Sequence, residues 1–146
     1  MNISVHNRQR GVRVRLPWLR RFASLALLKC QDHSDDGRFA LRRLPEVEVA
    51  IVSDRVIADV HRRFMDIPGA TDVITFEHGE IVMSAQTAAL YARDYSHSVD
   101  VELALYIIHG LLHLNGYEDA TKSDAARMHR VQQRLLQACL AQIPPA

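Results

Sequence analysis

The chain has 146 residues, 48% of them hydrophobic and 24% charged, with a formal net charge of +1. These values are ordinary for a globular protein with a real hydrophobic core, so we expect one domain over residues 1–146. They exclude a low-complexity chain, and no apolar segment is long enough to span a membrane.

The N-terminal half of the chain predicts alternating strands and helices. Strands are expected where β-branched and apolar residues run together between turn residues. Helices are expected where apolar residues recur at helical spacing behind Pro, Ser or Asp. In chain order these elements are a strand over Ile3–Asn7, a helix from Pro17 to about Lys29, a strand over Val47–Val52, and a helix that Ser53 or Asp54 caps and that runs to about Phe64.

The C-terminal half predicts a hairpin followed by three helices. Its elements are strands over Val73–Phe76 and Ile81–Met83, a helix from Ser84 to about Tyr95, a helix over Val99–Leu114, and a last helix from Thr121 or Ser123 through Leu136. The sum is an α/β fold in which a mixed four-stranded sheet packs with about five helices. The Val99–Leu114 helix is expected to lie on the sheet.

Two histidines in the most apolar predicted helix indicate a metal site. His109 and His113 are four residues apart, so both imidazoles leave one helix face, one turn apart. Gly116 can end the helix in the left-handed conformation, after which the chain turns back and brings Asp119 as a third ligand. Two His and one carboxylate leave a fourth position open, as a hydrolytic site requires, and zinc is the preferred ion. The alternative is a pair of helix histidines satisfied by hydrogen bonds.

The residue after the first histidine discriminates between classes of hydrolase. Helical zinc peptidases carry a Glu there as general base, whereas this chain has Gly110, which cannot transfer a proton. Peptidase chemistry by that route is therefore disfavoured. Glu118, beside the third ligand, is the candidate base or further ligand, against the alternative of a solvated turn carboxylate. The catalytic residue that moves protons stays unknown at this point.

The histidine segment resembles the signature of a known family. His109-Gly-Leu-Leu-His-Leu-Asn-Gly-Tyr117 is similar to the start of H-G-x-L-H-L-x-G-Y-D-H, which is typical of the bacterial YbeY family. Upstream, Thr71–Phe76 resembles the family's T-D-V-L-S-F strand and Gly79–Ser84 its G-D-I-V-I-S strand. Val52-Ser-Asp54 and Met128 also fit the family pattern, so the resemblance spans about residues 46–136.

The resemblance implies a metal-dependent, single-strand-specific endoribonuclease with a zincin-like metal helix. It implies maturation of ribosomal RNA, notably at the 3′ end of small-subunit rRNA, and ribosome quality control. The metal would be one Zn²⁺, or another divalent ion, held by His109, His113 and the residue at position 119. The expected partners are ribosomal RNA and the small ribosomal subunit. We expect a cytoplasmic monomer that does not enter a membrane.

The chain departs from the family pattern at two site positions. The family's third ligand is His, whereas this chain has Asp119, and a carboxylate can take that place. The family also has an Arg after an aromatic residue, but here Phe64 is followed by Met65, which cannot pair with an anion. Arg62 and Arg63 are the remaining candidates for substrate binding, although a helix would point them elsewhere.

Charge and cysteine usage bear on partners and compartment. Residues 1–43 contain ten Lys or Arg and three acids, for a net charge of +7, and residues 44–146 carry −6. This fits contact with RNA phosphates, and it equally fits a solubilising face that the acidic remainder partly neutralises. Cys30 and Cys139 lie far apart and are expected to be free buried thiols in a reducing compartment rather than a disulfide.

Two functions besides the nuclease stay open. One is a zinc-dependent hydrolase of another substrate, such as a peptide or a small ester, although Gly110 disfavours the peptide. The other is a non-catalytic ribosome-associated factor that keeps the fold and has lost catalysis, which Asp119 and Met65 favour. The endoribonuclease is preferred, and the family resemblance carries most of that preference.

Overall fold

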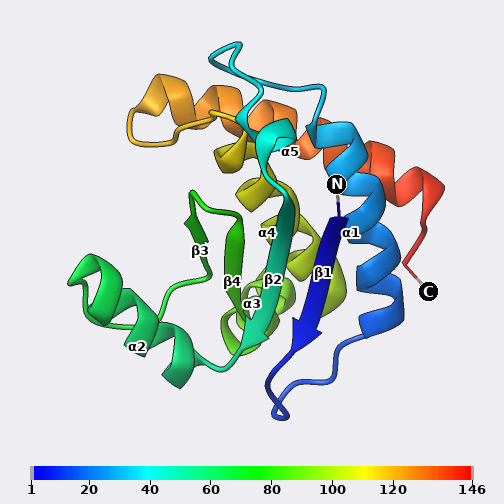
Figure 1. Ribbon diagram of the computed structural model, residues 1–146. Helices are drawn as coiled ribbons and strands as arrows, with labels where there is room; N and C mark the ends of the chain where they lie inside the picture. The colour runs from blue at the N-terminus through cyan, green and yellow to red at the C-terminus, as the bar shows by residue number, and fades with distance from the viewer. Residues whose placement is uncertain (1, 146) are drawn as a thin grey trace.

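The computed structural model describes residues 2–145 and has the predicted α/β architecture, with one mixed four-stranded sheet (Figure 1). The strands are β1 (Asn2–Asn7), β2 (Glu46–Val52), β3 (Val73–Phe76) and β4 (Glu80–Ser84). They lie in the order β1-β2-β4-β3. The first three in that order are parallel, and β3 is antiparallel to β4, with which it forms the predicted hairpin.

Five α-helices lie within residues 2–145, which confirms the predicted number. They are α1 (Leu16–Cys30), α2 (Asp54–Met65), α3 (Ala85–Asp94), α4 (Val99–Leu114) and α5 (Lys122–Gln142). Ser53, Ser84, Ser98 and Thr121 each accept a backbone N–H at a helix start, so the last cap is Thr121 and not Ser123. A short 3₁₀ helix, η1 (Ala40–Arg43), was not predicted because four residues are too few to show an apolar period.

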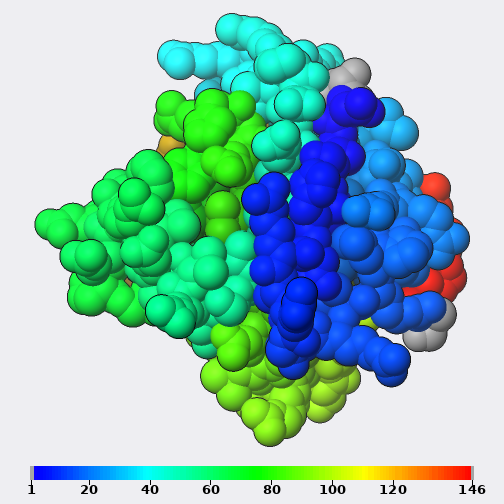
Figure 2. Space-filling view, turned by 60° about the horizontal axis from the view of Figure 1, so that its bottom comes forward, coloured from blue at the N-terminus to red at the C-terminus, as the bar shows by residue number. Residues whose placement is uncertain are grey.

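Helices cover both faces of the sheet. On one face α1 and α4 pack on the strands, with α5 across them, and on the other face α2 lies near β4 (Figure 1). The alternation within β2 explains this, because Val47, Val49 and Ile51 belong to the main core while Val52 joins the smaller core under α2. β1 is an edge strand and runs along the surface beside α1 (Figure 2, dark blue).

Helix α4 approaches β4 unusually closely at one glycine. A Cβ on Gly110 would lie 2.7 Å from Cδ1 and 3.0 Å from Cγ1 of Ile81, so a larger residue would push the helix from the sheet. The absence of a side chain at Gly110, which disfavours peptidase-type base chemistry, thus also matters for packing. It allows the turn of helix that begins at His109 to lie close to the strands.

The side chain of Asn115 joins the end of α4 to two other segments. It is fully buried, and its Oδ1 accepts the backbone N–H of Leu41 in η1 at 3.1 Å. Its Nδ2 donates to the carbonyl of Cys30, the last residue of α1, at 2.9 Å and to that of His33, just after the helix, at 2.7 Å. Gly116 follows at φ 99° with the Asp36 carboxylate against it, so only glycine fits this turn.

Two further predictions concern the chain as a whole. Cys30 and Cys139 are free and buried, as predicted, and burial raises the pKa of both thiols. Among residues 2–145, no helix has both the length and the apolar character needed to cross a membrane.

Replacing Asn115 by Ala should lower the free energy of unfolding by about 2–4 kcal/mol, because three hydrogen bonds are lost and the buried N–H of Leu41 is left without its acceptor. Urea denaturation followed by circular dichroism measures this. The exposed Asn7 provides a matched control, and Asn7→Ala should change stability by less than about 0.5 kcal/mol. Equal stability of the two variants would contradict the structural role of Asn115.

Candidate metal centre

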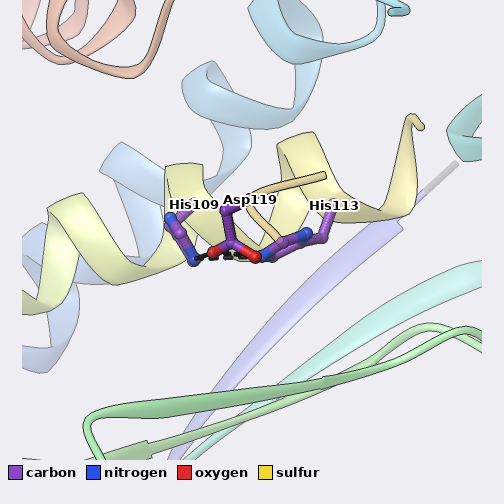
Figure 3. Close-up of side chains that lie close together, drawn as sticks. All are labelled: His109, His113 and Asp119. Carbon is purple, nitrogen blue, oxygen red and sulfur yellow. Dashed lines mark hydrogen bonds and ion pairs between the residues drawn. The ribbon is translucent and has the colours of Figure 1, made fainter. Parts of the chain in front are cut away.

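The three predicted ligand residues converge on one point (Figure 3). His109 and His113 leave adjacent turns of α4, and their Nε2 atoms are 3.0 Å apart. Asp119 arrives from the turn that follows α4, and its Oδ2 lies 3.6 Å from Nε2 of His109 and 3.4 Å from Nε2 of His113. The turn through Gly116 therefore brings the carboxylate back to the histidine face, as the sequence predicts.

The far nitrogen of each imidazole is held by an oxygen acceptor. Nδ1 of His113 donates to the backbone carbonyl of Tyr117 at 2.9 Å, and Nδ1 of His109 donates to Oε1 of Gln132 on α5 at 2.7 Å. A ring that donates from Nδ1 presents an unprotonated Nε2 when it is neutral. Burial lowers the pKa of His109, which favours the neutral ring. Both rings thus direct lone pairs at the same point as the carboxylate.

This donor set fits a divalent metal ion. Bonds of about 2.0–2.1 Å in a tetrahedral zinc site place ligand atoms about 3.3 Å from one another. The observed separations of 3.0, 3.4 and 3.6 Å lie around that value. Two imidazoles and a carboxylate suit zinc and several other transition ions, and three protein ligands leave a fourth position open. Without a cation, two lone pairs and a carboxylate would face one another at these distances.

A cleft of about 460 Å³ opens beside the three ligands. The exposed Glu118 lies on its wall, so the candidate base is near the ligands. His61 and Met65, one turn apart on α2, also line the cleft. Met65 therefore occupies the cleft in which the family resemblance implies an Arg.

The two arginines that were candidates for substrate binding lie outside this cleft. Arg62 and Arg63 are exposed on α2 and are absent from the described residues that line it. Arg63 pairs instead with Asp59 at 3.5 Å. A role for either arginine in binding substrate stays a prediction and would require contact beyond the cleft.

Two site residues were missed by the sequence analysis. Gln132 lies on the buried face of α5 in sequence with Met128, Leu135 and Cys139, and a polar residue on that apolar face was a usable signal. His61 precedes Met65 by four residues, so helical spacing already places the two on one face. The Tyr117 carbonyl carried no signal, because a backbone group has no sequence signature.

Comparison with known proteins identifies the family. A family model described as Endoribonuclease YbeY matches residues 5–140. The chain belongs to the YbeY endoribonuclease family. The match confirms the predicted resemblance and a family of hydrolases. It also extends the resemblance beyond residues 46–136, because the basic N-terminal segment is included.

Individual YbeY relatives agree with this assignment. Endoribonuclease YbeY of Mycolicibacterium gilvum is 32% identical over 130 residues, which cover 73% of this chain and 73% of the relative. Endoribonuclease YbeY of Mycobacterium tuberculosis is 35% identical over 115 residues, which cover 66% of this chain and 65% of the relative. A Thermotoga maritima protein solved in solution matches with a TM-score of 0.65 at 22% identity, over 96% of this chain and 90% of that chain, and so shares the fold.

Replacing Gln132 by Ala should weaken Zn²⁺ binding by roughly 10- to 100-fold, because His109 loses the acceptor that holds its ring. Competition with a chromophoric chelator measures the affinity. Gln137→Ala is the matched control, because Gln137 is exposed on the same helix, and it should bind zinc as wild type does. Asp119→Ala should lose more affinity than Gln132→Ala, since it removes a ligand. Unchanged affinity in Gln132→Ala would mean that the His109 ring needs no support.

Proposed function

We propose that this chain is a single-strand-specific, metal-dependent endoribonuclease that binds one Zn²⁺ at His109, His113 and Asp119. The supporting observation is the convergence of two Nε2 atoms and one carboxylate oxygen beside an open cleft. Relatives at 32% and 35% identity are named Endoribonuclease YbeY, which supports RNA as the substrate.

The chemistry divides between the ion and the chain. A divalent ion at these ligands would polarise a phosphoryl oxygen and lower the pKa of a water molecule that attacks the phosphodiester. Gln132 and the Tyr117 carbonyl keep the two rings oriented for this task. Glu118 lies on the cleft wall and is the chain's candidate to accept a proton. Thr75 also lines the cleft, where its hydroxyl can donate to a phosphate oxygen.

The biological setting is part of the proposal. We infer that the substrate is ribosomal RNA, matured at the 3′ end of the small-subunit RNA or removed in ribosome quality control, in the cytoplasm. The partner would be the small ribosomal subunit and the enzyme a monomer. The net charge of +7 on residues 1–43 supports attraction to RNA phosphates, because this term needs no sequence-specific contact.

One observation favours a second candidate function. Met65 contributes a thioether to the cleft, and this cannot pair with a phosphate. A ribosome-associated factor without catalysis would tolerate that loss. Such a factor should still co-sediment with small subunits after His113→Ala, whereas it should not cleave RNA. A zinc hydrolase of esters or peptides would instead turn over those substrates.

The nuclease is tested with a single-stranded precursor of the small-subunit rRNA 3′ end and zinc-loaded protein. His113→Ala should lower the cleavage rate by more than the roughly 10- to 100-fold that loss of a supporting residue costs, and a chelator should stop cleavage by wild type. His6→Ala is the matched control, since His6 is exposed on β1, and it should cleave as wild type does.

Equal cleavage by wild type and His113→Ala would identify a contaminating nuclease. No cleavage by any zinc-loaded variant, together with co-sedimentation with small subunits, would replace the proposed function by the binding factor.

A further inference from the structure

A second cavity lies on the other side of His109. Its volume is about 790 Å³, within the roughly 300–1,000 Å³ typical of small-ligand sites, and α3, α4 and α5 contribute its walls. We call it the tyrosine cavity, after the side chains of Tyr91, Tyr95 and Tyr106 that line it. These three tyrosines neither bind the metal nor take part in the proposed catalysis.

The tyrosine cavity adjoins the metal-side cleft. Asp72, Val73 and His109 line both spaces, so a chain molecule with one group at the metal centre can place the next group in the tyrosine cavity. An RNA strand bound for cleavage is such a molecule. A substrate held at the metal centre is thus a suitable occupant of the cavity.

The charges of the tyrosine cavity suit a nucleobase and not a phosphate. The described residues that line it include the carboxylates Asp72 and Glu102 and no Lys or Arg. Carboxylates repel a phosphate, but they accept hydrogen bonds from the N–H groups of bases. Glu102 has a side chain only 5% exposed, and its Oε1 lies 2.6 Å from Nε2 of His97, which holds the carboxylate in place.

Aromatic side chains at the rim provide faces for stacking. Tyr95 is 70% exposed and Tyr91 is 40% exposed, values that are high for large side chains with no role in the core. The Tyr95 ring lies nearly parallel to that of His97, with centroids 6.3 Å apart. A flat aromatic surface beside a cleavage site is the usual platform for an unpaired base.

One buried polar group in the wall of the cavity lacks a partner. Tyr106 is only 4% exposed, and within the described part of the chain its hydroxyl makes no hydrogen bond of good geometry, although the Glu102 carboxylate is near it. Burial, together with the Glu102 carboxylate, raises the pKa of this hydroxyl, so it stays protonated. Such a group is normally satisfied by a ligand or an ordered water, and a base offers the required acceptor atoms.

We propose that the tyrosine cavity binds the unpaired nucleobase next to the phosphate at the metal centre. Tyr95 stacks on the base, Glu102 accepts from its N–H groups, and the Tyr106 hydroxyl donates to it. This inference rests on the proposed nuclease function, because it places an RNA strand at the metal. It assigns single-strand specificity to a defined space, since a paired and stacked base could not enter.

The test uses a fluorescein-labelled single-stranded RNA of about eight nucleotides, within the ~4–16 nucleotides that single-strand binders cover, and derivatives that each lack one base. Equilibrium binding to zinc-loaded protein is measured by fluorescence anisotropy, within the time over which gels show the RNA intact. Loss of one base, or of two adjacent bases, should weaken binding to wild type by roughly 5- to 150-fold, the range for a stacked base.

Variants locate the effect in the cavity. Tyr95→Ala should weaken binding of the complete RNA and abolish the dependence on the missing base, because the two changes remove the same contact. Tyr106→Phe keeps the ring and should weaken binding by roughly 2- to 12-fold, as one hydrogen bond is lost. Leu28→Ala, at an exposed apolar residue of α1 outside both spaces, should bind as wild type does.

Three outcomes would overturn the proposal. One is equal binding of all base-deficient RNAs by wild type, and another is a positional effect that persists in Tyr95→Ala. The third is that an arginine-rich peptide binds wild type but not Tyr95→Ala, while the two proteins bind RNA equally, since the cavity would then be a docking site for a protein.

Cleavage by the same preparations separates the two proposals. Cleavage without a base-dependent position would refute only the role of the tyrosine cavity, and base-dependent binding without cleavage would refute only the nuclease.

Discussion

The buried amide of Asn115 is the contact on which the geometry of the metal centre depends. It fixes the end of α4 against the residues that follow α1 and against η1. The next two residues continue into the site: Gly116 makes the turn, and the carbonyl of Tyr117 holds the ring of His113. A displacement at Asn115 would therefore move His113 and the segment that brings Asp119 back to it together. The hydrogen bonds that stabilise the fold and those that orient the site share one short segment, which explains why the three consecutive residues Asn115, Gly116 and Tyr117 are so constrained.

The site also depends on packing between elements that are distant in sequence. Gly110 lets α4 lie against Ile81 of β4, and Gln132 reaches His109 from α5. The orientation of the His109 ring is consequently coupled to the position of α5, which contributes no candidate ligand. Burial lowers the pKa of His109 and outweighs the hydrogen bond to Gln132, which raises it, so the neutral ring is favoured. The two supporting oxygens fix the orientation of the rings, with both Nε2 atoms directed at the site.

Two departures from the family pattern change the electrostatics of the site. Asp119 supplies a negative charge where the family resemblance implies a neutral imidazole, so a divalent ion with these ligands carries about one unit less net charge than it would with three histidines. Met65 lines the cleft in place of the positively charged Arg that the family resemblance implies. Both changes weaken attraction for a phosphate at the metal. Contacts to a base in the tyrosine cavity would restore part of that substrate affinity without added charge, and the N-terminal basic segment would contribute at longer range.

The sequence by itself determined the strands, the five helices and the set of candidate ligands. Apolar period and capping residues act locally, and the spacing of His109 and His113 fixes a shared helix face in any α-helix. The glycine at position 116 also predicted the turn that brings Asp119 back to the two histidines. Tertiary structure alone decided that Gln132 supports His109, that the face of α2 with His61 and Met65 turns to the cleft, and that three helices enclose the tyrosine cavity. These are contacts between segments far apart in the chain, and they depend on how helices rotate and pack, which no local pattern encodes.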